Sequence, residues 1–203
     1  SVVGAGMGMA STLTPEEQAQ SYFGSADARI QVFSPTGSVY EWIDDNLREI
    51  APEVEVTELR QTGVRVPDVG YAQVWDLDMS APETEGFLVH VAGDLPSAVD
   101  EVAVSPALAE ALEVEVGDVV EFEELPVGEM TIVGLVSDPF FNQSTDVLLS
   151  PGSLEPLVGD PALLPEPSLL VSGPDAENAA LQVVDRWYSE GQQLFWPEPA
   201  VDP

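Results

Sequence analysis

The chain has 203 residues, 44% of them hydrophobic, and a formal net charge of −32 that comes from 37 acidic residues against five arginines and no lysine. It is long enough to bury a core as one domain or as two small lobes. Its charge excludes nucleic acid as a partner and disfavours anionic lipid headgroups, because both are bound chiefly by Lys and Arg.

Two explanations of the acidity stay open. An acidic surface without lysine suits a chain that faces high salt, where screening shortens the repulsion between charges. A basic ligand or partner is the alternative. The chain also lacks cysteine, which excludes disulfide frameworks and thiolate metal sites.

The first predicted elements lie in residues 1–25. Residues 1–10 are small, uncharged and apolar, and we expect them to be the end of a first transmembrane helix or a flexible leader. A stalk helix is predicted next, with Thr14 at its N-cap, Pro15 at its first position and Glu17 as capping-box partner. No apolar run of about 18 to 20 residues occurs, so no complete membrane span is predicted within the chain.

Alternation and helical periodicity then predict an α/β region. Residues 28–33 and 54–66 alternate like half-buried strands, and residues 71–77 read as the antiparallel neighbour of the second strand, with a further strand at 87–91. Between the first two strands lies a helix over residues 38–50. Its apolar face is predicted from Tyr40, Ile43, Leu47 and Ile50.

The composition changes at residue 93, where a β-rich region begins. A strand over residues 101–104 leads into a short helix that Ser105 caps. Further strands are predicted at residues 119–120, 130–136 and 147–149. Near the C-terminus we expect a strand over residues 168–171. After it we expect a helix that Asp175 caps, whose apolar face holds Leu181, Val184 and Tyr188.

Four segments occur in an order that resembles a known family. They are VAVSPALAEAL (residues 102–112), VGDVV (116–120), MTIVGLV (130–136) and VLLSP (147–151). In this order they resemble the MacB-type periplasmic core domain of FtsX-like ABC transporter permeases, and residues 8–20 (GMASTLTPEEQAQ) resemble the exit from a first transmembrane helix. The Pro-rich stretch at residues 151–167 and the extreme charge depart from the family pattern and leave the subfamily open.

The resemblance implies an α+β fold with two lobes. Residues 26–92 and 167–203 would form an α/β porter-like lobe, and residues 93–166 an inserted β-rich subdomain. The implied protein lies at the extracytoplasmic face of the cell membrane and has neither a cofactor nor a catalytic site. Its implied partners are a second permease subunit, a cytoplasmic ABC ATPase reached through the membrane part, and a lipoprotein, peptide or cell-envelope protein.

The sequence gives little indication of a catalytic or metal-binding site. His90 is the only histidine and lies in an apolar run, which is typical of a strand residue rather than of a metal ligand or base. Acidic pairs such as Asp76 and Asp78 carry little information among 37 acids, and that segment lacks the glycine and final glutamate of a calcium loop.

The candidate contact residues are Phe140, Phe141, Asn142 and Gln143. Two adjacent aromatic residues on a strand cannot both point inward, so one of them is predicted to be exposed for a partner. A loop that folds both rings back is the alternative. For the whole chain, the alternatives to a permease domain are a free-standing secreted acidic binding module and an acidic hydrolase that uses two carboxylates.

Overall fold

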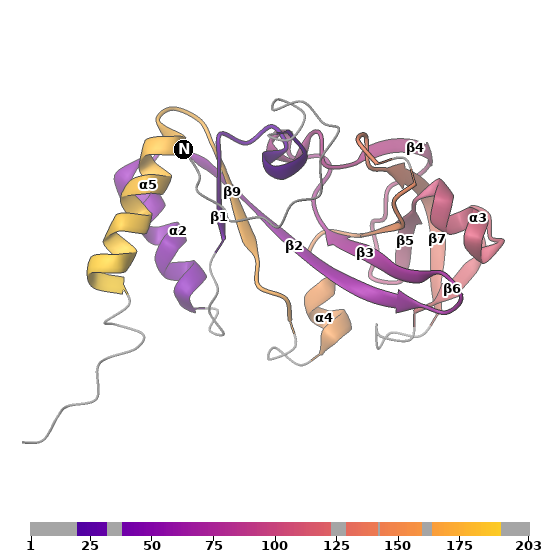
Figure 1. Cartoon of the computed structure of the whole chain (residues 1–203). Coiled ribbons are helices and arrows are strands. Elements are labelled where there is room, and N and C mark those ends of the chain that lie inside the picture. Colours follow the sequence, from indigo (N-terminus) through magenta and orange to yellow (C-terminus); the bar gives the residue numbers. More distant parts are fainter. Residues whose placement is uncertain (1–19, 32–37, 123–128, 142, 160–163, 192–203) are drawn as a thin grey trace, which may run out of the picture.

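One long strand, β2 (Glu55–Val66), runs through both lobes of the molecule (Figure 1). The computed structural model describes residues 20–31, 38–122, 129–141, 143–159 and 164–191. The other elements are β1 (Ala28–Gln31), α2 (Ser38–Ile50), β3 (Gly70–Asp76), η1 (Pro82–Thr84), β4 (Val89–Gly93), β5 (Glu101–Val104), α3 (Pro106–Leu112), β6 (Val119–Glu121), β7 (Glu129–Ser137), β8 (Asp146–Leu149), α4 (Leu154–Val158), β9 (Ser168–Ser172), α5 (Ala176–Arg186) and the π-helical turn η2 (Trp187–Gly191).

The strands form one mixed sheet in the order β1-β9-β2-β3-β8-β5-β7-β4, and β6 pairs with β7. The first half of β2 pairs antiparallel with β9, ending at Leu59 opposite Ser168. The second half pairs antiparallel with β3, starting at Arg60 opposite Asp76. The sheet therefore passes from one lobe to the other between two adjacent residues of a single strand. The α+β fold with two lobes is confirmed.

In the α/β lobe, α2 and α5 lie side by side against β1 and β9 (Figure 1). Ile43 and Leu47 are buried, as the helical period predicts, whereas Tyr40 and Ile50 at the ends of that face are half-buried. The Trp42 and Trp187 rings meet edge-on with centroids 5.5 Å apart and join the two helices.

The predicted apolar face of α5 is not the face that packs on the core. Leu181, Val184 and Tyr188 point to solvent, and the buried face consists of small residues. These are Ala176, Ala179, Ala180 and Val183. Small side chains let the helix lie close to its neighbours, so the alanines make the core contact and the large residues are left outside.

The predicted cap of α5 is also wrong. Asp175 precedes the helix, but its φ of 63° is left-handed and its side chain makes no capping hydrogen bond. Its carboxylate instead accepts from Nδ2 of Asn178 at 3.0 Å. Ser105, by contrast, caps α3 as predicted, because its hydroxyl accepts from the Leu108 N–H.

The β-rich lobe is built around β5, which lies between β8 (antiparallel) and β7 (parallel). On one side β8 pairs in parallel with β3, and on the other β4 closes the sheet against β7. The strand pairing thus places β3 and β4 with this lobe, although the predicted boundary at residue 93 assigned both to the α/β lobe. The strand predicted at residues 87–91 begins later, since Phe87 and Leu88 are buried in the core and pairing starts at Val89.

Steric crowding explains why the MTIVGLV segment has a glycine, Gly134, in the middle of β7. A Cβ on Gly134 would lie 2.1 Å from the Asp94 carbonyl oxygen and 2.8 Å from that of Ala92. Gly93 faces Gly134 across the β4–β7 pair and has a φ of +73°. The two backbones therefore approach so closely that neither position accommodates a side chain.

A hydrophobic cluster, which includes Leu59, Trp75, Phe87 and Leu170, fills the junction between the lobes. Arg29 of β1 reinforces it, because its guanidinium donates to Gln61 Oε1 at 3.1 Å and to Ser168 Oγ at 3.0 Å. Of the predicted stalk, residues 20–23 are helical; Thr14, Pro15 and Glu17 lie outside the described residues.

Candidate partner-contact surfaces

The loop between β7 and β8 presents one aromatic side chain to solvent. Phe140 is half-buried and Phe141 is 52% exposed, as the sequence predicts for one of the two. Gln143 is exposed, and Asn142 lies outside the described residues. The Asp138 carboxylate holds the turn by accepting from the Phe140 N–H at 2.7 Å and the Phe141 N–H at 3.0 Å.

The other end of the loop is tied to a buried polar cluster that the sequence reasoning missed. Asp146 is only 2% exposed, and its carboxylate accepts from Nε1 of Trp75 at 2.9 Å and from the Ser144 hydroxyl. The Ser105 hydroxyl donates to the Ser144 carbonyl at 2.8 Å. The one available signal was an aspartate directly before three buried strand residues. Hydrogen bonds therefore hold both ends of the loop that carries Phe141.

The environment of the loop shifts the pKa of Asp138. Burial raises the pKa of Asp138 above its usual value, and the nearby charge of Asp146 raises it further. The two backbone N–H groups act in the opposite direction by stabilising the anion.

The outer face of α5 is the second candidate surface. Leu181 and Tyr188 are 60% and 68% exposed, and Val184 lies between them on the same face. A solvent-facing stripe of three large apolar residues at helical spacing is typical of a contact surface.

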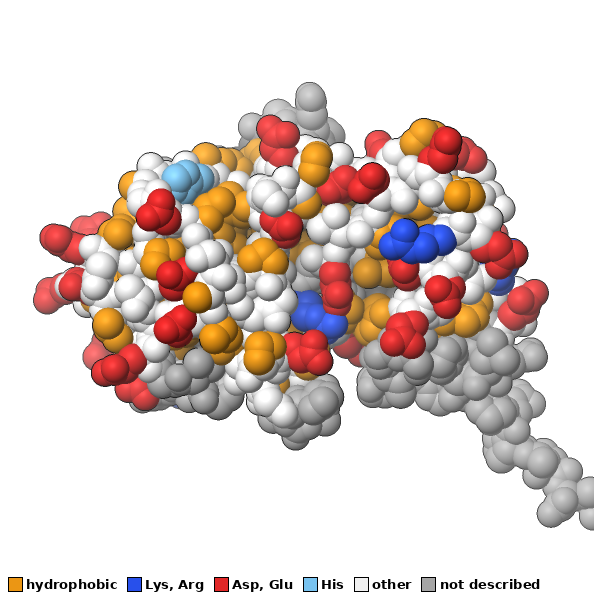
Figure 2. All heavy atoms as spheres, turned by 180° about the vertical axis from the view of Figure 1, so that it is seen from behind, with side chains coloured by type: hydrophobic (Ala, Val, Ile, Leu, Met, Phe, Trp, Pro, Cys, Tyr) orange, Lys and Arg blue, Asp and Glu red, His pale blue; other side chains and the backbone are white. Residues whose placement is uncertain are grey.

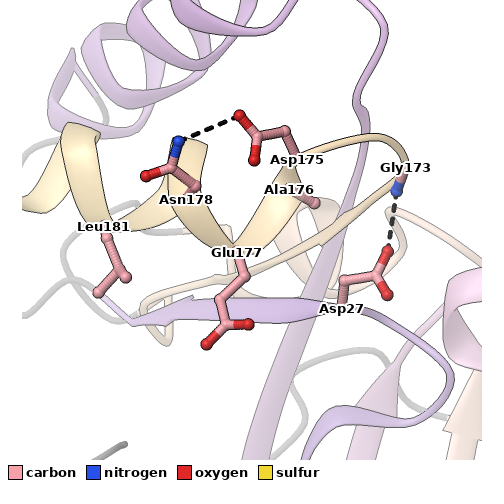
Figure 3. Close-up of a pocket in the computed structure, with 7 residues that line it drawn as sticks. All are labelled: Asp27, Gly173, Asp175, Ala176, Glu177, Asn178 and Leu181. Carbon is pink, nitrogen blue, oxygen red and sulfur yellow. Dashed lines mark hydrogen bonds between the residues drawn. The ribbon is translucent and has the colours of Figure 1, made fainter.

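A pocket of about 370 Å³ lies at the start of this helix. Figure 3 shows Glu177 and Leu181 extending from the same side of α5, toward the segment that carries Asp27. The Asp27 carboxylate accepts from the Gly173 N–H at 2.9 Å. Asp27, Asp175 and Glu177 make the pocket acidic, so it disfavours an anionic ligand.

A second concavity, of about 350 Å³, lies beside β2 where the lobes meet. It contains Asp76 and Asp78, but both carboxylates have structural partners. Asp76 accepts from the N–H groups of Gly152 at 2.7 Å and Leu154 at 2.8 Å, and Asp78 accepts from the Ser80 N–H at 2.8 Å. These acids therefore stabilise the turns around α4 and η1.

Metal and base chemistry find no support in the described part of the chain. No group of three or more His, Asp or Glu side chains there could hold a metal ion. His90 is exposed on β4, and its Nε2 lies 3.0 Å from the Gly93 carbonyl oxygen, which is a local contact.

The acidic side chains spread over both lobes of the face shown in Figure 2, where basic side chains occupy only small areas. The ion pairs among the described residues are Arg48 with Asp44, Arg60 with Glu58, and Arg186 with Glu49. With 37 acidic residues against five arginines, most of the acids have no cation available to pair with.

No protein-family model matches the chain, and the comparison with curated proteins finds no match. Its structure, however, matches the extracellular domain of the ABC-type transporter YknZ from Gram-positive bacteria, with a TM-score of 0.52 at 10% identity over 80% of this chain and 95% of that domain. The chain has the fold of an ABC-transporter extracellular domain.

The periplasmic region of MacB from Actinobacillus actinomycetemcomitans also aligns, with a TM-score of 0.49 at 14% identity over 79% of this chain and 75% of that region. The match to the YknZ domain confirms, at the level of the fold, the resemblance carried by the four sequence segments. In the described residues, no helix has the length and apolar character needed to cross a membrane.

Proposed function

We propose that the chain is the extracytoplasmic domain of an ABC transporter permease. In this role it binds a partner outside the membrane and transmits to it the motion that ATP hydrolysis produces in a separate cytoplasmic subunit, without catalysis of its own. The observation that carries the proposal is the match to nearly the whole extracellular domain of YknZ. The partners on this reading are a second permease subunit and a lipoprotein, peptide or cell-envelope protein.

The continuity of β2 supports the transmission of motion. Residues on either side of Leu59 and Arg60 pair with different lobes, so no flexible linker separates the lobes along this strand. Arg60 strengthens the crossing, because its Nη1 donates to the Pro165 carbonyl at 2.7 Å. On this proposal, a displacement of the α/β lobe is passed to the β-rich lobe through β2.

The coding sequence on both sides of this segment gives the first test. The proposal expects apolar runs of about 20 residues before and after the segment, with a gene for an ABC ATPase nearby. If the chain is instead a secreted acidic binding module, the alternative that the charge favours, we expect neither the flanking apolar runs nor the ATPase gene. Flanking sequence without any such run would sink the permease assignment.

The role of the β7–β8 loop as a partner contact can be tested in the full-length protein. Phe141→Ala should reduce co-purification of the extracytoplasmic partner while the ATPase still co-purifies. Val99→Ala is the control, since Val99 is an exposed apolar residue outside both candidate surfaces. Equal partner loss in both variants, or loss in neither, would remove the loop from the proposal.

A further inference from the structure

A groove of about 420 Å³ lies at the end of the β-rich lobe, where the β2–β3 turn, the end of α3 and β6 come together. Its floor is apolar and includes the buried Val66 and Val120 and the half-buried Leu112, all of which belong to or pack on the main core of this lobe. An open apolar floor next to a well-packed core offers a place for one apolar side chain of another molecule.

Three carboxylates line the same groove, and no basic residue does among the described residues that line it. They belong to Asp68, Glu113 and Glu121, one from each of the three segments. In the described part of the chain, none of the three side chains forms a hydrogen bond or an ion pair with another residue. Their charges are therefore available to a bound molecule.

Two of these acids occupy backbone positions that suit glycine better. Asp68 has a φ of 62° and Glu113 a φ of 56°, in the left-handed region. Glu113 ends α3, at the position where helices most often place glycine. Asp tolerates the left-handed region, whereas Glu is strained there, so stability alone does not account for Glu at position 113.

The charge of the groove and its apolar floor limit the kind of ligand. The three carboxylates do not form a group that could hold a metal ion, and their charge disfavours anionic ligands such as nucleotides or phospholipids. Three separate carboxylates around an apolar floor instead complement a ligand that has several cationic side chains around one apolar side chain. A peptide segment supplies that arrangement.

We propose that this groove binds a basic segment of a partner protein, with one apolar side chain on the floor and flanking Lys or Arg side chains on Asp68, Glu113 and Glu121. The site lies apart from the β7–β8 loop, and the proposal holds whether the chain is a permease domain or a secreted module.

The test uses a fluorescein-labelled peptide in which one leucine is flanked on each side by two arginines, with binding followed by fluorescence anisotropy. We expect Glu113→Gly to weaken binding about fivefold, the factor of a partly exposed ion pair. The same variant should melt at an equal or higher temperature, because glycine relieves the left-handed strain. Loss of affinity together with retained stability separates a binding role from a structural one.

Glu110→Gln is the matched control, because it removes an exposed charge from the same helix outside the groove. It should change affinity less than about twofold. Replacing the leucine of the peptide by serine should also weaken binding. Absence of binding by the arginine–leucine peptide, equal losses in Glu113→Gly and Glu110→Gln, or indifference to the leucine would each overturn the proposal.

Discussion

Trp75 and Asp146 are joined side chain to side chain, with the indole Nε1 donating to the buried Asp146 carboxylate at 2.9 Å. The bond connects β3 to β8 at the base of the loop that carries Phe141. A buried carboxylate loses its hydration on folding, so its stability depends on such donors.

Trp75→Phe keeps an aromatic ring in the junction cluster but removes the donor. We expect it to lower the free energy of unfolding by about 1–3 kcal/mol, because the Asp146 carboxylate is left short of a partner. Urea denaturation followed by circular dichroism measures the change. The double variant Trp75→Phe with Asp146→Asn should lose less than the sum of the single variants, and additive losses would show that the two side chains act independently.

Gly134→Ala should destabilise the β-rich lobe by about 1–3 kcal/mol, the range for overpacking. The added methyl group would collide with the Asp94 carbonyl oxygen, which belongs to backbone and cannot swing aside. Gly63→Ala in β2 is the control, because a Cβ there meets no atom within 4 Å. It should leave the melting temperature unchanged or raise it, and a loss in both variants would point to a general intolerance of alanine.

Asp138→Asn should flatten the pH dependence of stability at acid pH. The folded-state pKa of Asp138 is raised by burial, so the stability it contributes is present below its unfolded pKa and is lost as the pH rises through the raised value. The variant should therefore melt higher than the parent chain at about pH 7 and like it at about pH 3. Differential scanning fluorimetry across this range measures the difference.

Glu101→Gln is the control of opposite sign for that experiment. Hydrogen bonds from the Ser97 backbone and hydroxyl lower the pKa of Glu101, so its contribution is present at neutral pH and is lost as the pH falls. The variant should melt lower than the parent chain at about pH 7. If both variants shift in the same direction, their effects do not come from the two pKa changes.

Added salt should stabilise the chain. The net charge of −32 makes the folded state repel itself, and raising NaCl from about 0.1 M to 1 M shortens the Debye length from about 10 Å to about 3 Å. We expect the melting temperature to rise steeply at first and then level off. A rise that stays linear up to several molar would indicate a general salting-out effect instead.

Local patterns predicted the elements well and their assembly less well. The helical period identified the buried Ile43 and Leu47 of α2, and the hairpin of β2 and β3 followed from their alternation. The helical period failed to identify the buried face of α5, because it was judged from the large apolar residues. The side chains that contact the core are mostly alanines.

The parallel pairing of β3 with β8 joins segments about 70 residues apart, and no local signal specifies such a register. The Trp75–Asp146 bond that depends on this pairing was hidden for the same reason. The exposure of Phe141 could be predicted from a local pattern, whereas the acidic groove could not, because its three segments meet only in the folded chain.

The sharing of β2 between the lobes also sets an order in which the chain assembles during synthesis. All strands that pair within the β-rich lobe lie at or before residue 149, so this lobe can complete its sheet while the C-terminal segment is still being made. β1 emerges before any other described strand, yet it pairs only with β9 in the described residues. The first described strand is therefore among the last of the described strands to pair, and until residues 168–172 are synthesised the first half of β2 has an unpaired edge that is open to a wrong strand.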